Sequence, residues 1–457
     1  MKNRSFPALL DSIVLALLLL AMCSQFDLAM LGRDTYATEK FATKRLAIAL
    51  PDIALLLAFT WFCLRTTMLR AWGRVWLPPF ACFALVFCLI LSAIHSPTVV
   101  EAVSSALSEA SGPKAMIKAL LAKEGKEAIA ETIQWTAYFL FAPLVFVNLL
   151  RDVRDANGPT ISRLKLASHV FGGAVLLNIL WAAKQRFLDG SAAPQGFFNS
   201  PNAYGAFLVL ALPILLAQGI ATWRGKPALP IAFACLGGTL LTVSSVWAGA
   251  GIILGLVFAG SWQGMRPRAT ILLIACLPFL LLWDTPSRLQ KLRIESARVA
   301  SSFQPVKKQF REWFIVSGAS VPREKVFATG VGAGNYQFNS GSYYKSLPSP
   351  AQEKLPPDSN NLVTVQFVAI GALGLAALAW AWSWFWGCAW RARRLDNWLA
   401  AGALASLTAF AVVNIFHAAI VRGTGVALAF IFALAVISQY GEHEFQREVE
   451  PEAQQNA

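Results

Sequence analysis

Two polar motifs between long apolar segments carry the residue types best suited to binding or chemistry. The first reads QGFFNSPN over residues 195–202 and directly precedes an apolar run. Asn199 and Asn202 are helix-capping residue types, and an unpaired helix N-terminus with its positive dipole end suits a phosphate. The motif therefore has two interpretations, a helix cap and a phosphate-binding helix start.

The second motif reads GVGAGN and ends at Asn335. It superficially resembles a dinucleotide-binding loop, but it neither follows a convincing strand nor opens a long helix. Glycines at this spacing also permit the backbone to turn sharply and to approach a partner closely. We therefore predict a sharp turn that approaches a partner closely at this motif, and no nucleotide.

Signatures of metal or nucleotide chemistry are absent from the sequence. It contains no HExxH pattern, no paired aspartates of the DxD type and no Walker A run, so that no cofactor is expected. His169 and His417 lie deep in apolar runs. Such histidines are more often hydrogen-bonded to a neighbouring helix than catalytic.

Composition places these motifs in a membrane. The chain has 457 residues, of which 56% are hydrophobic and only 14% charged. So few charges are not enough to cover the surface of a soluble enzyme, and the same composition excludes a disordered chain or a disulfide-stapled secreted domain. The net charge of +14 then indicates cytoplasmic anchoring and anionic lipids, with no nucleic acid partner.

Apolar runs predict an all-α polytopic membrane protein with about twelve spanning helices. We expect helices one to nine within residues 1–284, a large, partly helical outer loop at 285–360, helices ten to twelve within 361–440 and a disordered cytoplasmic tail at 441–457. The distribution of Lys and Arg over the short loops favours cytoplasmic N- and C-termini. Segment 97–128 predicts either an amphipathic interfacial helix or a solvated connector.

The motifs and their order resemble the O-antigen ligase and O-antigen polymerase superfamily of bacterial membrane glycosyltransferases. GFFNSPN at 196–202 is similar to that family's G-x-F-x-N-x-N helix start. Arg311-Glu312-Trp313 followed by GVGAGNY at 330–336 resembles its large-loop motif, and NNL at 360–362 with GALG at 371–374 resembles its return into the membrane. The predicted order of spans, with one large loop before the tenth, agrees as well.

The resemblance implies a glycosyltransferase in the bacterial inner membrane. Its donor would be an undecaprenyl-diphosphate-linked glycan, and its acceptor a lipid A–core, another glycan repeat or a protein, at the periplasmic face. Neither a nucleotide sugar nor a metal would be needed. Cations would stabilise the departing diphosphate, and a base, usually a histidine, would take the acceptor proton.

Three positions differ from the family pattern. Ala193 and Ser245 stand where the family has arginines, and Asn360 stands where it has a histidine. The family's roles are therefore not carried over to these three residues. Other residues in and near the motifs could bind the diphosphate in place of the family's arginines, because the region carries positive charge. The candidate binding residues are Lys184, Arg186, Asn199, Asn202, Arg288, Arg311 and Asn335.

The candidate catalytic residues are Asp358, which would assist the acceptor hydroxyl, and its neighbour Asn360. Three readings follow. The first is an active, divergent transferase. The second is a catalytically degenerate member that binds the carrier lipid or partners other polysaccharide-assembly proteins. The third is a twelve-helix transporter, which the missing internal repeat and the late position of the long loop disfavour.

Overall fold

The computed structural model describes the parts of the chain that form a helical bundle. The described residues are 5–30, 47–94, 123–151, 163–221, 235–239, 241–243, 290, 293–294, 296–297, 300, 327–334, 336, 361–392, 398–416, 419–420 and 422–447.

The described elements are mainly long helices. In chain order they are α1 (Ser5–Met22), β1 (Asp27–Met30), β2 (Ala47–Ala49), α2 (Leu50–Met68), η1 (Trp72–Arg74), α3 (Phe80–Ile94), α6 (Lys123–Thr136), η2 (Ala137–Phe141), α7 (Ala142–Leu150), α8 (Arg163–Phe187), α9 (Pro201–Ala221), α17 (Leu362–Ala392), α18 (Trp398–Phe416) and α19 (Arg422–Arg447).

Among the described residues, six helices are long and apolar enough to cross a membrane, and three further apolar helices are shorter. The six include Leu50–Met68, Arg163–Phe187 and Leu362–Ala392. The chain is accordingly a multi-pass membrane protein with a helical fold. Most of the expected spans between residues 229 and 283, and nearly all of the loop at 285–360, lie outside the described residues.

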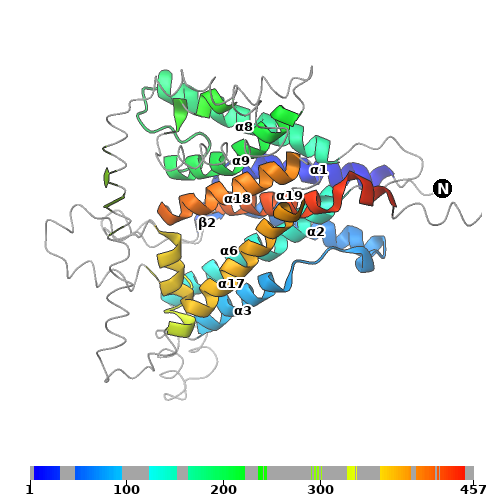
Figure 1. The fold of residues 1–457 in the computed structure, drawn as a ribbon, viewed down its shortest axis with the longest axis horizontal. Helices are drawn as coiled ribbons and strands as arrows, with labels where there is room; N and C mark the ends of the chain where they lie inside the picture. The colour runs from blue at the N-terminus through cyan, green and yellow to red at the C-terminus, as the bar shows by residue number, and fades with distance from the viewer. Residues whose placement is uncertain are drawn as a thin grey trace, which may run out of the picture.

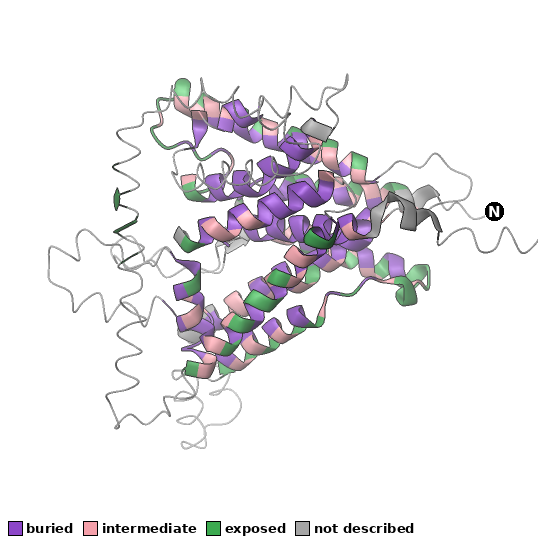
Figure 2. Ribbon diagram, in the orientation of Figure 1, coloured by how far each residue is buried: buried purple, intermediate pink, exposed green. Residues whose placement is uncertain are grey.

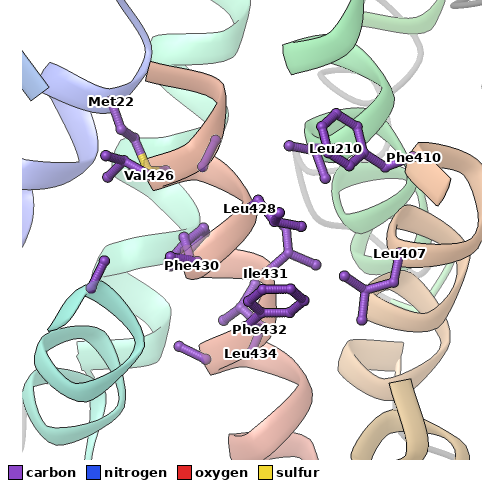
Figure 3. Close-up of a cluster of buried hydrophobic side chains, with 14 of the residues drawn as sticks. Met22, Leu210, Leu407, Phe410, Val426, Leu428, Phe430, Ile431, Phe432 and Leu434 are labelled. Carbon is purple, nitrogen blue, oxygen red and sulfur yellow. The ribbon is translucent and has the colours of Figure 1, made fainter. Parts of the chain in front are cut away.

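Helix α19 lies at the centre of the bundle. Figure 1 shows α18 and α19 between α8 and α9 on one side and α17 and α3 on the other. Phe430 packs against the rings of Phe146 and Phe171, with ring centroids 5.2 and 5.1 Å apart. Phe432 stacks on Phe385 at 4.1 Å. The close-up in Figure 3 shows this part of the core, where aliphatic side chains of α18 and α19 surround the rings.

Small residues bring α9 and α18 close together. A Cβ at Gly402 would lie 2.9 Å from the Cα of Ile214, and Ser406 donates a hydrogen bond to the carbonyl oxygen of Leu210. Small residues and inter-helix hydrogen bonds of this kind stabilise helix pairs in membranes. Figure 2 shows both helices buried along most of their length, while α3 and α17 present exposed residues outward.

Three boundaries differ from those predicted. The first helix, predicted over residues 12–29, ends at Met22 and is followed by the polar residues Ser24 and Gln25. Strand β1 then pairs antiparallel with β2. Helix α6 begins at Lys123 and continues through η2 into α7, so that the end of segment 97–128 belongs to a spanning helix. Helix α19 continues to Arg447, because Glu, Gln and Arg after residue 441 are good helix formers.

Candidate functional site

The connection between α8 and α9 is fixed by side chains that the sequence interpretation missed. Asn178, fully buried in α8, donates to the carbonyl oxygen of Cys23 and accepts from the backbone N–H of Phe197 at 2.9 Å. Gln185 accepts from the N–H groups of Gln195 and Gly196 and donates to the Gly196 carbonyl oxygen. The loop therefore has a defined conformation.

The same loop is tied to the end of α1. The backbone N–H of Gln25 donates to the Phe197 carbonyl oxygen at 3.0 Å, and its side-chain oxygen lies 3.4 Å from the Asn199 N–H. Gly196 has a φ of 58°, and a Cβ there would lie 3.0 Å from the Tyr204 ring. Glycine is required at this position, both for the backbone conformation and for the space.

The helix cap differs from the prediction. Ser200 caps α9, because its hydroxyl accepts from the Ala203 N–H at 3.1 Å and its carbonyl oxygen accepts from Tyr204. Pro201 takes the first helical position, where its missing N–H costs nothing. The side chains of Asn199 and Asn202 are exposed. Neither amide is the cap, and both lie at the surface beside the start of α9.

A further polar contact joins a third segment to this region. The Tyr204 hydroxyl, in the first turn of α9, lies 2.9 Å from the hydroxyl of Thr242. Thr242 stands three positions before Ser245, which is itself outside the described residues. Residue 193, another of the three positions that differ from the family pattern, is an exposed alanine in the α8–α9 connection.

Lys184 and Arg186 lie in the last turn of α8. Lys184 forms an exposed ion pair with Asp189 at 3.2 Å, and its ammonium lies 4.8 Å from the centre of the Trp181 ring. Side chains that are two residues apart on a helix point in directions that differ by about 200°. The two cations therefore point to opposite sides of α8, and they cannot grip one phosphate together without a change in the end of the helix.

The glycine motif makes a close approach, as its sequence predicts, and its partner is the backbone of α17. Helix α17 is kinked at Gly371 (φ 70°, ψ −174°), as Figure 1 shows by the change of direction near its start. The N–H groups of Val331 and Gly332 donate to the carbonyl oxygens of Val368 and Ala369 at 2.9 and 3.0 Å. Ser92 of α3 also donates to the Ala369 oxygen, at 2.7 Å. The kink frees these carbonyls, and the motif satisfies them.

Asn361 caps α17 and is fully buried. Its side-chain oxygen accepts from the Thr364 N–H at 3.1 Å, so that residue 361 fixes where the chain returns into the bundle. The preceding candidate residues Asp358 and Asn360 lie outside the described residues, as do Arg288, Arg311 and Asn335. The structure thus places four of the predicted site residues, Lys184, Arg186, Asn199 and Asn202.

Both motifs lie at one end of the bundle. In Figure 1 the N-terminus is at the right, whereas the α8–α9 connection and the start of α17 are at the left. Hydrogen bonds support this placement. The α8–α9 loop bonds to Gln25 just after α1, and the glycine motif and Ser92 near the end of α3 both bond to the Ala369 carbonyl oxygen. Motifs more than 130 residues apart in the sequence therefore face the same side of the membrane.

The opposite end contains a buried charge cluster. Asp11 of α1 is fully buried and forms ion pairs with Arg65 of α2 at 3.1 Å and Arg163 of α8 at 2.8 Å. The Trp61 indole donates to its other carboxylate oxygen. Arg65 and Arg163 belong to the Lys and Arg residues whose distribution favours cytoplasmic termini, and their buried side chains also join three helices.

The contact of the His169 ring lies within its own helix. Its side chain is exposed, and Nδ1 lies 2.6 Å from the Lys165 carbonyl oxygen of the same helix; His417 lies outside the described residues. In the part of the chain that the structure describes, no group of His, Cys, Asp and Glu could hold a metal ion.

No known family model matches the chain, and no curated protein is significantly similar to it.

Proposed function

We propose that this protein transfers a glycan from an undecaprenyl-diphosphate carrier to an acceptor at the periplasmic face of the bacterial inner membrane. One observation carries the proposal. The two motifs that resemble the O-antigen ligase and polymerase superfamily are built into one end of the bundle, each by specific backbone hydrogen bonds. Gly196, Gly330 and Asn361 have structural roles within these motifs.

The reaction would be a glycosyl transfer without a nucleotide or a metal. An acceptor hydroxyl oxygen attacks the anomeric carbon of the donor, and the bond from that carbon to the diphosphate oxygen breaks. The diphosphate leaves with the bonding electrons, and the hydroxyl proton passes to a base. The protein must therefore supply positive charge for the leaving group and an acceptor for one proton.

Positive charge is available beside the α8–α9 loop. Lys184 is about half exposed, and its ion pair with Asp189 is exposed too, so that exchange of the aspartate for a phosphate costs little. Arg186 lies on the other side of α8, and Arg311 belongs to the loop whose sequence resembles the family's. We assign Arg186 and Arg311 to the diphosphate and Asp358 to the acceptor proton.

A catalytically degenerate protein is the second candidate. Ala193, Ser245 and Asn360 favour it, because each stands where the family has a charged or titratable residue. Such a protein would keep carrier binding and assist polysaccharide assembly. The kink in α17 does not favour a transporter. Broken helices in transporters bind substrates or ions, but the carbonyls freed at Gly371 accept hydrogen bonds from backbone and serine donors.

Complementation tests the diphosphate assignment. A deletion strain carrying the wild-type gene should restore surface glycan or polymer, and the Arg186→Ala, Arg311→Ala double variant should not, at equal membrane levels. A matched control is the Arg70→Ala, Arg74→Ala pair near η1, at the predicted cytoplasmic side. Undiminished glycan in the Arg186/Arg311 variant would refute the diphosphate assignment. Solute accumulation in proteoliposomes would favour the transporter.

A further inference from the structure

An apolar groove of about 480 Å³ lies between α1, α2 and α8. Its lining follows one face of each helix. Val14, Leu17, Leu20 and Ala21 come from α1, Leu50, Ile53, Ala54, Leu57 and Ala58 from α2, and Ala174 and Leu177 from α8, with Cys23, Ser24, Phe26 and Phe197 at one end.

The groove opens toward lipid. Leu57 is 64% exposed and both Leu17 and Leu177 are 59% exposed, although all three belong to helices of the apolar bundle. The polar lining atoms are already used, since the Ser24 hydroxyl donates to the Ala21 carbonyl oxygen and the Cys23 thiol to that of Leu19. A hydrocarbon chain is therefore the chemistry that fits this lining.

One end of the groove leads to a cation. Leu177, Trp181 and Lys184 lie four and three residues apart and share one face of α8. The Trp181 ring stacks on the Phe197 ring with centroids 5.5 Å apart, and the Lys184 ammonium lies over the Trp181 ring. Lys184 is about 10 Å further along the helix than Leu177. The apolar lining, the aromatic pair and the cation follow one another along α8. This order matches a lipid whose hydrocarbon chain lies in the groove and whose anionic headgroup lies at Lys184.

We propose that this groove holds the chain of a single-chain lipid with a phosphate headgroup, and that Lys184 contacts the phosphate. One groove bounded by three helices suits one chain, whereas a phospholipid has two. That the chain is a polyprenyl chain rests on the proposed function. The α8–α9 loop then contacts the lipid chain through Phe197, which lines the groove.

Binding is measured by native mass spectrometry of the purified full chain with undecaprenyl phosphate as the probe. Ala54→Phe fills the groove and should lower the bound fraction by about tenfold or more, since each CH₂ that is excluded loses its burial. Ala84→Phe is the matched control, because Ala84 is a half-buried alanine of α3 away from the groove. Lys184→Ala should lower binding of undecaprenyl phosphate but leave binding of undecaprenol unchanged.

A wild-type experiment makes the test independent of variant folding. A polyprenyl phosphate with a diazirine in its chain should crosslink to peptides containing Leu17, Leu57 or Leu177. Crosslinks concentrated on α3 or spread evenly over lipid-facing peptides would overturn the proposal, and so would equal competition by phosphatidylglycerol.

The groove and the transferase can fail separately. Crosslinking at α1, α2 and α8 in a protein with no transferase activity would retain the groove and reject the enzyme. Full glycan output and full probe binding by Ala54→Phe would reject the groove and leave the enzyme standing.

Discussion

Gly330 and Gly371 pack backbone against backbone. A Cβ on Gly330 would lie 2.6 Å from the nitrogen of Gly371, and a Cβ on Gly371 would lie 2.6 Å from the nitrogen of Gly330. Both residues have a positive φ, of 76° and 70°. The contact holds the glycine motif against the kink of α17, so that it fixes the motif and the returning helix together.

Alanine at either glycine should destabilise the protein. Gly330→Ala and Gly371→Ala each place a methyl group into backbone and force a strained φ, which costs about 1–3 kcal/mol or more. Thermal unfolding in detergent, followed by size-exclusion chromatography, measures the loss. Gly173→Ala is the control, since a Cβ there meets nothing within 4 Å and the helix should gain slightly. Equal melting temperatures for all three variants would contradict the contact.

The buried cluster around Asp11 should matter for stability. Asp11→Leu leaves Arg65 and Arg163 buried without their carboxylate, and loss of one partner of a buried pair typically costs about 3–5 kcal/mol. The same thermal assay should show a large loss. Asp189→Ala breaks the exposed pair with Lys184 and should cost at most about 1 kcal/mol. A melting temperature for Asp11→Leu as high as that of Asp189→Ala would show that the cluster does not join the helices.

Asn178 should control the order of the α8–α9 loop. Asn178→Leu removes its hydrogen bonds to Cys23 and Phe197 and leaves buried polar groups unpaired, at about 1–3 kcal/mol. Hydrogen exchange of the Phe197 amide should become faster. Asn148→Leu is a control with a similar loss at the other end, since Asn148 bonds to Trp76. Unchanged protection of Phe197 in Asn178→Leu would refute this role.

Asp358 is the predicted acceptor-side base. Asp358→Asn keeps the size of the side chain and removes its proton affinity, so that glycan output should fall by about 10²–10⁴-fold at unchanged membrane levels. Quantified glycan from the complemented deletion strain measures the effect. Asp52→Asn, at the N-terminus of α2, controls for loss of a carboxylate. Output within a factor of about two of the wild type would remove Asp358 from the reaction.

Apolar length and the glycine pattern sufficed to predict much of the fold. Residues 166–183 and 203–220 predict α8 and α9 closely, because a span needs about 20 apolar residues. The close approach at the GVGAGN motif was also predictable, since glycine is the residue that permits it. Its partner was not, because nothing local in residues 330–335 points to a kink at Gly371.

Buried polar residues were the main omission. Asn178 is the one amide within its apolar run, which is a usable signal, but a search limited to ionisable side chains passes over it. Asp11 lies one residue before the start of the first predicted span at residue 12, and so a search for ionisable side chains within the spans does not include it. Its arginine partners come from helices 50 or more residues away in the sequence, and only the packing of the bundle brings them together.

Turnover by the purified protein tests the central claim most directly. Proteoliposomes containing the full chain, an undecaprenyl-diphosphate-linked oligosaccharide and an acceptor glycan should release undecaprenyl diphosphate together with extended product, with no added nucleotide sugar or metal. The Arg186→Ala, Arg311→Ala protein should release little. The donors and acceptors are taken from the host's own surface glycans. If the folded protein binds the donor lipid but forms neither product, the proposed transferase activity is contradicted.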